Sequence, residues 1–205
     1  MTTFHRTVET YQQGAHTMPR EYYVSPDVLV EERERIFARQ WNCVGRASRL
    51  ARPGDYFVRT VAGESLIILR DRDGDLRAFF NVCRHRGTQI CREASGQFSE
   101  TIQCPYHAWT YTTDGRLIGA PHMHEVEGFD KRDFPLHAAA VAEYEGFVFV
   151  NVSDDPQPFD QYFAPMMQRL SRFGLADLEV GHSVRYEVHA NWKLVFQNYS
   201  EGPIS

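Results

Sequence analysis

Hydrophobic and polar positions follow two different periods along the chain. Residues 25–41 show a helical period, because apolar side chains recur at intervals of three and four: Leu29, Val30, Ile36, Phe37 and Trp41. Ser25 suits the N-cap of this helix and Pro26 its first position. Residues before about 20 show no clear period and predict an irregular arm.

From Trp41 onward, short apolar runs alternate with turn residues, which predicts antiparallel β-structure. The predicted strands are NCVGR from Asn42, YFVRTVA from Tyr56, ESLIILR from Glu64, LRAFFNV from Leu76, WTYTT from Trp109, RLIG from Arg116 and GFVFVNV from Gly146. Asp73-Gly74 and Asp114-Gly115 each lie between two such runs, where they predict hairpin turns.

The pattern changes again after a polar segment with two prolines, residues 153–158, which predicts a boundary. A helix is expected next, with a late start or a kink at Pro165, from these helically spaced residues: Phe163, Met166, Met167, Leu170 and Phe173. Alternation over residues 184–188 predicts a half-buried strand. Asn191 suits the N-cap of a last helix, whose apolar face holds Trp192, Val195, Phe196 and Tyr199.

Composition narrows the class of protein. The 205 residues are 42% hydrophobic and 24% charged, with a formal net charge of -5, as in ordinary globular domains. No apolar run approaches the ~20 residues needed to span a membrane, and no basic excess favours a nucleic-acid partner. The N-terminus lacks the apolar core of a secretory signal, so we expect a cytoplasmic protein with neither membrane nor nucleic acid as a partner.

Four cysteines, Cys43, Cys83, Cys91 and Cys104, match two disulfides in number, a pattern expected in secreted chains. Cys43 lies in a mixed apolar stretch and is predicted to be a buried small side chain. Cys91 has no neighbouring histidine and is left out of the set of candidate metal ligands.

Two short arms, Cys83-x-His85 and Cys104-x-x-His107, each combine one thiol with one imidazole. Because 18 residues separate His85 from Cys104, the arms must meet by folding. A sulfide-bridged iron pair needs two protein ligands at each end, and mixed arms could give both sulfurs to one iron and both imidazoles to the other, as in a Rieske [2Fe-2S] cluster. A single tetrahedral zinc is the alternative, although zinc arms usually pair like with like.

Residues 81–87, NVCRHRG, and residues 104–111, CPYHAWTY, resemble the Rieske motif of ring-hydroxylating and related Rieske oxygenase α subunits. The resemblance covers about residues 20–201 and includes NWKLV at 191–195, which is typical of an oxygenase rather than a small Rieske ferredoxin. It implies an α+β fold: a mainly antiparallel β Rieske domain with flanking helices and an incomplete α/β catalytic domain. The implied divisions are an arm and helix at 1–40, the Rieske domain at 41–152, and a linker with the start of the catalytic domain at 153–205.

The resemblance also implies roles for the four candidate ligands. Cys83 and Cys104 would hold one iron, and His85 and His107 the outer one. The cluster would receive electrons from a reductase or ferredoxin and feed a mononuclear non-heme Fe(II), where O2 is activated and an organic substrate is hydroxylated or dealkylated. For the full-length protein, the resemblance implies a homotrimer as one possible assembly.

Two arginines and two aromatic residues lie next to the candidate ligands in the sequence and could assist the cluster. Arg84 and Arg86 either attract an acidic electron donor or pair with local carboxylates, and both alternatives stay open. Tyr106 and Trp109 are expected to be packing that shields the cluster.

Ligands for the mononuclear iron, two histidines and a carboxylate in this family, are not evident in the sequence. After Asn198-Tyr199-Ser200-Glu201 the chain reads Gly-Pro-Ile-Ser, without the expected histidine, and Gln197 stands where the family commonly has Glu. Glu201 could correspond to the acidic residue that bridges the two metal centres between subunits. His182 and His189 would lie on opposite faces of a strand, and His122 with His124 lacks a third ligand.

We therefore expect an electron-transferring Rieske chain that lacks the catalytic iron triad. A self-sufficient, ferredoxin-like Rieske carrier and a zinc-stabilised interaction module are the alternatives. Residues 119–123 are similar to family members that act on quaternary amines, but they do not decide between such substrates and aromatic ones.

Overall fold

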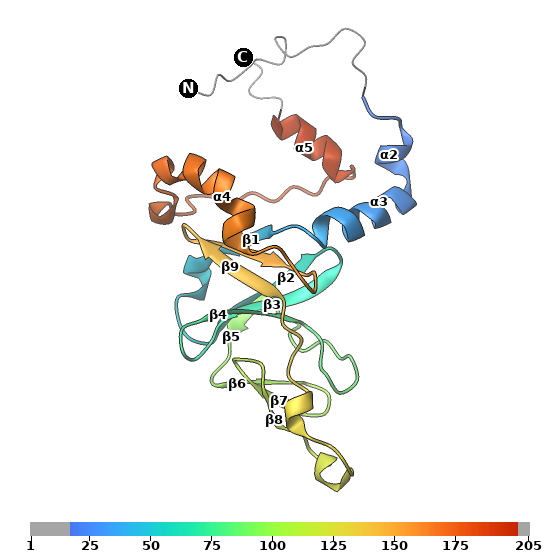
Figure 1. Cartoon of the computed structure of the whole chain (residues 1–205), viewed down its shortest axis with the longest axis vertical. Helices are drawn as coiled ribbons and strands as arrows, with labels where there is room; N and C mark the ends of the chain where they lie inside the picture. Colours follow the sequence, from blue (N-terminus) through green and yellow to red (C-terminus); the bar gives the residue numbers. More distant parts are fainter. Residues whose placement is uncertain (1–16, 201–205) are drawn as a thin grey trace. The chain divides into compact units, whose positions relative to one another are not determined.

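The computed structural model describes residues 17–200, which fall into two compact units (Figure 1). The larger unit is Arg33–Glu179. The smaller unit combines residues from both ends of the chain, of which 17–32 and 180–200 are described. Antiparallel sheets with helices at their margins confirm the predicted α+β class. The functional division at 41–152 stays a prediction.

Ten strands of the larger unit form three antiparallel sheets, ordered β1-β10-β9, β4-β3-β2-β5 and β6-β7-β8. Their bounds are β1 Asn42–Arg46, β2 Asp55–Val61, β3 Glu64–Arg70, β4 Leu76–Phe80, β5 Ser95–Gln97, β6 Thr101–Gln103, β7 Thr110–Thr112, β8 Leu117–Gly119, β9 Ala140–Tyr144 and β10 Phe147–Asn151. Its helical elements are the π-helix η1 Arg33–Phe37, the helix α4 Phe159–Leu170 and the 3-10 turns η2 Ala47–Leu50, η3 Met123–Glu125, η4 Lys131–Asp133, η5 Ser171–Phe173 and η6 Leu175–Asp177.

Strand β3 separates two hydrophobic cores. Its four central residues are completely buried, and because side chains alternate along a strand, they divide between the two faces of the sheet. Leu66 and Ile68 join the core that contains β10 residues, whereas Ile67 and Leu69 join the core that contains Cys83 and Cys104. The continuous apolar run in β3 is thus explained by burial on both faces.

Both predicted hairpin turns are confirmed. The β3–β4 turn is organised by Asp71, which is 1% exposed and accepts the backbone N–H groups of Asp73 at 3.0 Å and Asp75 at 2.8 Å. In the β7–β8 turn Gly115 has a φ of +92°, and a Cβ there would lie 2.6 Å from the Phe79 ring. Only glycine satisfies both conditions.

Helix α4 packs its aromatic side chains against β9 and β10 at one end of the larger unit, opposite the β6–β8 sheet (Figure 1). The rings of Phe159 and Phe163 each lie 5.0 Å from that of Phe149, and the Tyr144 hydroxyl donates to the Met167 carbonyl at 3.1 Å. The helix begins at Phe159 and contains Pro165, so of the two predicted alternatives the late start is wrong, and a kink at Pro165 stays a prediction. Packing of the first turn stabilises a start that the proline alone would disfavour.

The smaller unit contains α2 Glu21–Val24, α3 Pro26–Glu32 and α5 Trp192–Ser200. Both predicted caps are confirmed: Ser25 Oγ accepts the Val28 N–H at 3.5 Å, and Asn191 Oδ1 accepts the Lys193 N–H at 3.0 Å. Lys193 forms a salt bridge with Glu32, which also accepts the Trp192 indole N–H at 2.8 Å. These contacts tie α5 to the end of α3.

Two other predictions need correction. The strand predicted over residues 184–188 is wrong: the segment is extended without ladder pairing, and Val184, Tyr186 and Val188 are exposed. An alternating pattern makes a strand only when another strand supplies hydrogen bonds, and none of the described strands lies beside it. The first helix ends at Phe37 rather than at Trp41, whose ring instead packs against Phe159 at 5.2 Å.

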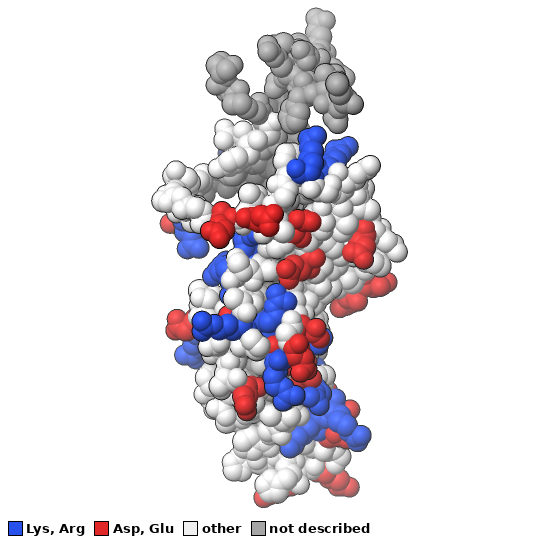
Figure 2. Space-filling model, turned by 90° about the vertical axis from the view of Figure 1, so that its left-hand side faces the viewer, with Lys and Arg blue, Asp and Glu red and all other residues white. Residues whose placement is uncertain are grey.

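No helix in the described range 17–200 is both long and apolar enough to cross a membrane. On the face shown in Figure 2, acidic and basic side chains are interspersed, without a continuous basic surface. That distribution is consistent with the net charge of -5.

Arg46 connects three parts of the larger unit, since its guanidinium donates to four backbone carbonyls: Glu145 at 3.0 Å, Leu175 at 3.1 Å, Ala176 at 3.3 Å and Leu178 at 2.8 Å. It also lies 4.4 Å from the centre of the Phe147 ring.

We expect Arg46→Met to lower the free energy of unfolding by about 2 kcal/mol, because the four hydrogen bonds and the ring contact of Arg46 are lost. The loss is limited to this size because these bonds are partly solvent-exposed. Urea denaturation measures the change. Arg72→Met, at a side chain that is 80% exposed, is the control and should change stability by less than about 0.5 kcal/mol; equal losses would contradict the role of Arg46.

Candidate metal centre

The two loops that carry the candidate ligands share one backbone design. Each begins at its cysteine and reverses direction at a residue with positive φ, Gly87 at +71° or Ala108 at +54°. The equivalent bonds are Cys83 N–H to Thr88 O at 2.8 Å, Gly87 N–H to Cys83 O at 2.9 Å, Cys104 N–H to Trp109 O at 2.8 Å and Ala108 N–H to Cys104 O at 3.1 Å. The loops therefore present their side chains in a similar way despite the different Cys–His spacing.

The cysteines of the two loops form a buried pair. Cys83 and Cys104 are 2% and 3% exposed, and their thiols are close enough to interact through a side-chain hydrogen bond. Burial raises the pKa of the Cys83 thiol, so without a cation the sulfur of Cys83 stays largely protonated. The buried Tyr111 hydroxyl lies 3.4 Å from Cys83 Sγ and accepts the Arg84 N–H at 3.2 Å.

The histidines form a second pair that is only half-buried. The ring centres of His85 and His107 are 4.7 Å apart at an angle of 71°. Burial, followed by the neighbouring His107, lowers the pKa of His85, which favours the neutral ring that binds metals. Nδ1 of His85 is buried and has no hydrogen-bond partner, an unusual state for a polar atom that a metal bond would resolve. The two thiols and two imidazoles therefore fit a [2Fe-2S] cluster.

Aromatic rings surround the histidine pair. The indole of Trp109 stacks on His85, with ring centres 4.9 Å apart at 8°, and is itself 2% exposed. Tyr106 lies 3.8 Å from His107 but is 63% exposed. Trp109 is therefore internal packing, as predicted, whereas Tyr106 covers His107 from the solvent side.

Sequence reasoning assigned no role to Asn81, which organises the first loop. Asn81 is 4% exposed, and its side chain makes four hydrogen bonds, accepting from Ile90 N–H at 3.1 Å and Cys91 N–H at 2.8 Å and donating to Cys91 O at 2.7 Å and Ser65 Oγ at 3.1 Å. A polar residue that ends an apolar strand just before Cys83 was the available signal.

The other cysteines do not join the ligand pairs. All four cysteines are free, which removes the two-disulfide alternative. Cys91 is 5% exposed, and burial raises its pKa to about 12, so it stays a thiol. Cys43 is exposed, so its predicted burial is wrong: β1 turns its side chain outward while the next residue, Val44, faces the core.

The remaining metal-ligand candidates stay apart. Among residues 17–200, no group of three or more His, Cys, Asp or Glu side chains is arranged to hold a single metal ion. Neither His122 with His124 nor His182 with His189 therefore belongs to such a group. His124 instead lies 3.5 Å from Glu125. Glu201 lies outside the described residues.

Comparison with known proteins places this geometry in a family. Residues 40–130 match the Rieske [2Fe-2S] domain model. The carnitine monooxygenase oxygenase subunit of Acinetobacter pittii is 40% identical over 189 residues, which cover 91% of this chain and 51% of that protein. The chain belongs to the family of Rieske oxygenase α subunits.

Two further Rieske oxygenases extend the comparison. The glycine betaine monooxygenase oxygenase subunit of Chromohalobacter salexigens is 35% identical over 190 residues, covering 93% of this chain and 42% of that one. A solved quaternary ammonium Rieske monooxygenase, described in terms of carnitine oxidation and inter-subunit electron transfer, is 40% identical with a TM-score of 0.82 and covers 88% of this chain and 50% of its own. The chain thus spans about half the length of these Rieske oxygenase relatives.

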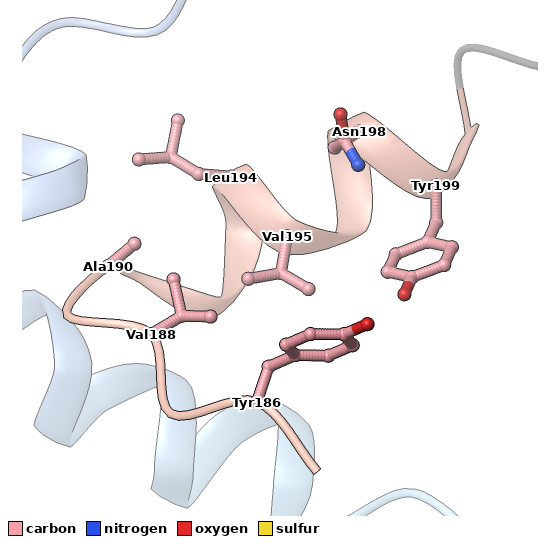
Figure 3. A pocket seen from close by; sticks show the side chains of 7 residues that line it. All are labelled: Tyr186, Val188, Ala190, Leu194, Val195, Asn198 and Tyr199. Carbon is pink, nitrogen blue, oxygen red and sulfur yellow. The ribbon is translucent and has the colours of Figure 1, made fainter. Parts of the chain in front are cut away.

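The smaller unit of the chain contains an apolar groove of about 600 Å³. Tyr186 and Val188 of the extended segment point toward Val195 and Tyr199 of α5 (Figure 3). Ala190, Leu194 and Asn198 complete the lining, which contains no charged side chain. The groove offers burial for apolar groups, and its polar groups are the hydroxyls of Tyr186 and Tyr199 and the amide of Asn198.

Proposed function

We propose that this chain is the electron-transferring part of a Rieske oxygenase subunit, in which Cys83 and Cys104 hold one iron of a [2Fe-2S] cluster and His85 and His107 hold the other. One observation supports this assignment above all: loops with mixed ligands fold so that thiol lies beside thiol and imidazole beside imidazole. When bound, the cluster carries one electron at a time.

The surroundings of the thiol pair and of the imidazole pair indicate which side of the cluster exchanges electrons with a partner. The thiols lie in the core, whereas the imidazoles are half-buried, so the histidine side is where an electron enters or leaves. The exposed Arg86 is suited to an acidic donor surface. We propose a reductase or ferredoxin as the donor, and a homotrimer as the assembly of the complete oxygenase.

Quaternary ammonium compounds are the proposed substrates of the complete oxygenase. The proposal is supported by the carnitine and glycine betaine relatives and by the similar residues 119–123. We further propose that the Rieske domain comprises residues 41–152 and that residues 153–200 begin the catalytic domain. The apolar groove beside α5 is consistent with a surface that such a domain buries.

Metal and sulfide analysis tests the cluster. After anaerobic reconstitution we expect about two irons and two acid-labile sulfides per chain, visible absorption, and a Rieske-type EPR signal after reduction. One zinc per chain without sulfide would support the zinc module instead. The 205-residue chain, supplied with a donor, O2 and L-carnitine, is expected to form no product; turnover would contradict the expectation that this chain lacks the catalytic iron triad.

Tyr111 is expected to raise the reduction potential of the cluster, because its hydroxyl can donate to Cys83 Sγ and so stabilise the added negative charge. Tyr111→Phe should lower the potential by on the order of 60 mV, which corresponds to about 1.4 kcal/mol for one electron. Redox titration monitored by EPR measures the shift. Tyr106→Phe, at an exposed ring beside His107, is the control and should leave the potential unchanged; equal shifts would refute the hydrogen bond as the cause.

A further inference from the structure

Residues 134–137 run beside the first ligand loop and are held at two points. The Leu136 N–H donates to Gly115 O at 2.8 Å in the β7–β8 turn, and His137 O accepts the Phe80 N–H at 2.9 Å at the end of β4. Leu136 is also 4% exposed and belongs to the core that contains the two ligand cysteines. This segment is therefore a fixed support for neighbouring groups.

Arg84 joins the first ligand loop to that support. Its Nη1 donates to the carbonyl of Pro135 at 3.1 Å and lies 3.4 Å from Nδ1 of His137. Its guanidinium also lies 5.9 Å from the centre of the Phe134 ring. Within residues 17–200 no carboxylate forms an ion pair with Arg84, so its predicted alternative as a partner of local acids is wrong.

The same segment reaches His85 by a second path. The Phe134 ring packs edge-on against Trp109, with centres 5.7 Å apart at 88°, and Trp109 stacks on His85. Residues 134–137 thus contact the residue before His85 in sequence and also support the ring that lies on His85. The hydrogen bond from Arg84 to Pro135 O restricts the ligand loop, and the packing of Phe134 on Trp109 restricts the His85 imidazole.

We propose that residues 134–137 form a brace for the first ligand loop, and that Arg84 is a positioning residue that fixes the orientation of His85. Arg86, on the other side of His85, is exposed and contributes charge to the surface without this link. The inference depends on the proposed function only where the cluster is concerned. The contacts of Arg84 belong to the protein alone, and side chains of this kind commonly orient metal ligands.

Arg84→Met and Arg86→Met form a matched pair, because each removes one positive charge next to His85. In the reduced, cluster-loaded chain we expect Arg84→Met to alter the 14N couplings of the histidine ligands in pulsed EPR, and Arg86→Met to leave them unchanged. In the cluster-free chain, hydrogen exchange of the Arg84 backbone amide should rise about tenfold in Arg84→Met and less than about twofold in Arg86→Met. Phe134→Leu changes no charge and breaks the other path to His85, so it too should alter the couplings.

Equal effects of the two arginine substitutions would overturn the proposal, since charge alone would then explain them. Unchanged couplings in both Arg84→Met and Phe134→Leu would overturn it as well. If Arg84→Met does not fold, Phe134→Leu still decides. Failure of the proposed function is a separate result: the unaltered chain would take up no iron and sulfide, while hydrogen exchange would still distinguish Arg84→Met from Arg86→Met.

Discussion

Cys104→Ser is expected to abolish the iron and sulfide content of the chain. The thiol of Cys104 lies beside that of Cys83 in a core where few other donors are available, and a serine hydroxyl is a poor substitute for a thiolate toward iron. Iron and sulfide per chain, together with the visible absorption of the reconstituted protein, measure the loss. We expect at least a tenfold reduction in the iron and sulfide content per chain.

Cys91→Ser is the matched control for this result. Cys91 is 5% exposed against 3% for Cys104, and both belong to the same core, so a buried hydroxyl costs about the same 1–3 kcal/mol of folding stability in each variant. Cys91→Ser should nevertheless retain its iron and sulfide. Equal loss of iron in the two variants would mean that the ligand assignment is wrong or that folding, not coordination, is being measured.

Asn81→Leu is expected to lower the free energy of unfolding by about 3 kcal/mol or more. The substitution removes four hydrogen bonds and leaves the N–H groups of Ile90 and Cys91 buried without their acceptor. Urea denaturation of the cluster-free chain measures the loss, so that metal binding does not contribute.

Gln89→Leu is the control for Asn81→Leu. Gln89 is exposed and donates to the same Cys91 carbonyl at 2.9 Å, but that carbonyl keeps its bond from Asn81 in the variant. We expect a loss of less than about 1 kcal/mol. Similar losses in the two variants would show that the Cys91 carbonyl, and not the buried amide of Asn81, is responsible.

Much of the secondary structure followed from short-range pattern. The strands β1 to β4, β7, β8 and β10 lie within the short apolar runs that predicted them, and the Asp-Gly turns identified two hairpins. Strands β5, β6 and β9 were missed, and β5 and β6 have only three residues each, too short to show a period. The segment 184–188 had the right pattern but no pairing partner among the described strands, and Pro165 lies within a helix that aromatic packing stabilises.

For the candidate site, too, one part could be predicted from the sequence and another part could not. Cys83, His85, Cys104 and His107 could be named from residue type and spacing alone, because few proteins place thiols and imidazoles at such intervals without binding metal. Which of them meet could not be read from the linear order, in which each thiol neighbours an imidazole. That pairing depends on β4, β6 and β7 bringing two loops of equal design together, thiols toward the core and imidazoles toward the surface.

Residues that act at long range were correspondingly hard to identify. Asn81 organises the site through residues nine and ten positions later, and Arg84 through residues 134–137, far along the chain. Local sequence is sufficient for ligand identity and for hairpins, because both depend on a few adjacent residues. The orientation of each ligand and the supports around it depend on hydrogen bonds and ring contacts between distant segments, which exist only once the chain has folded.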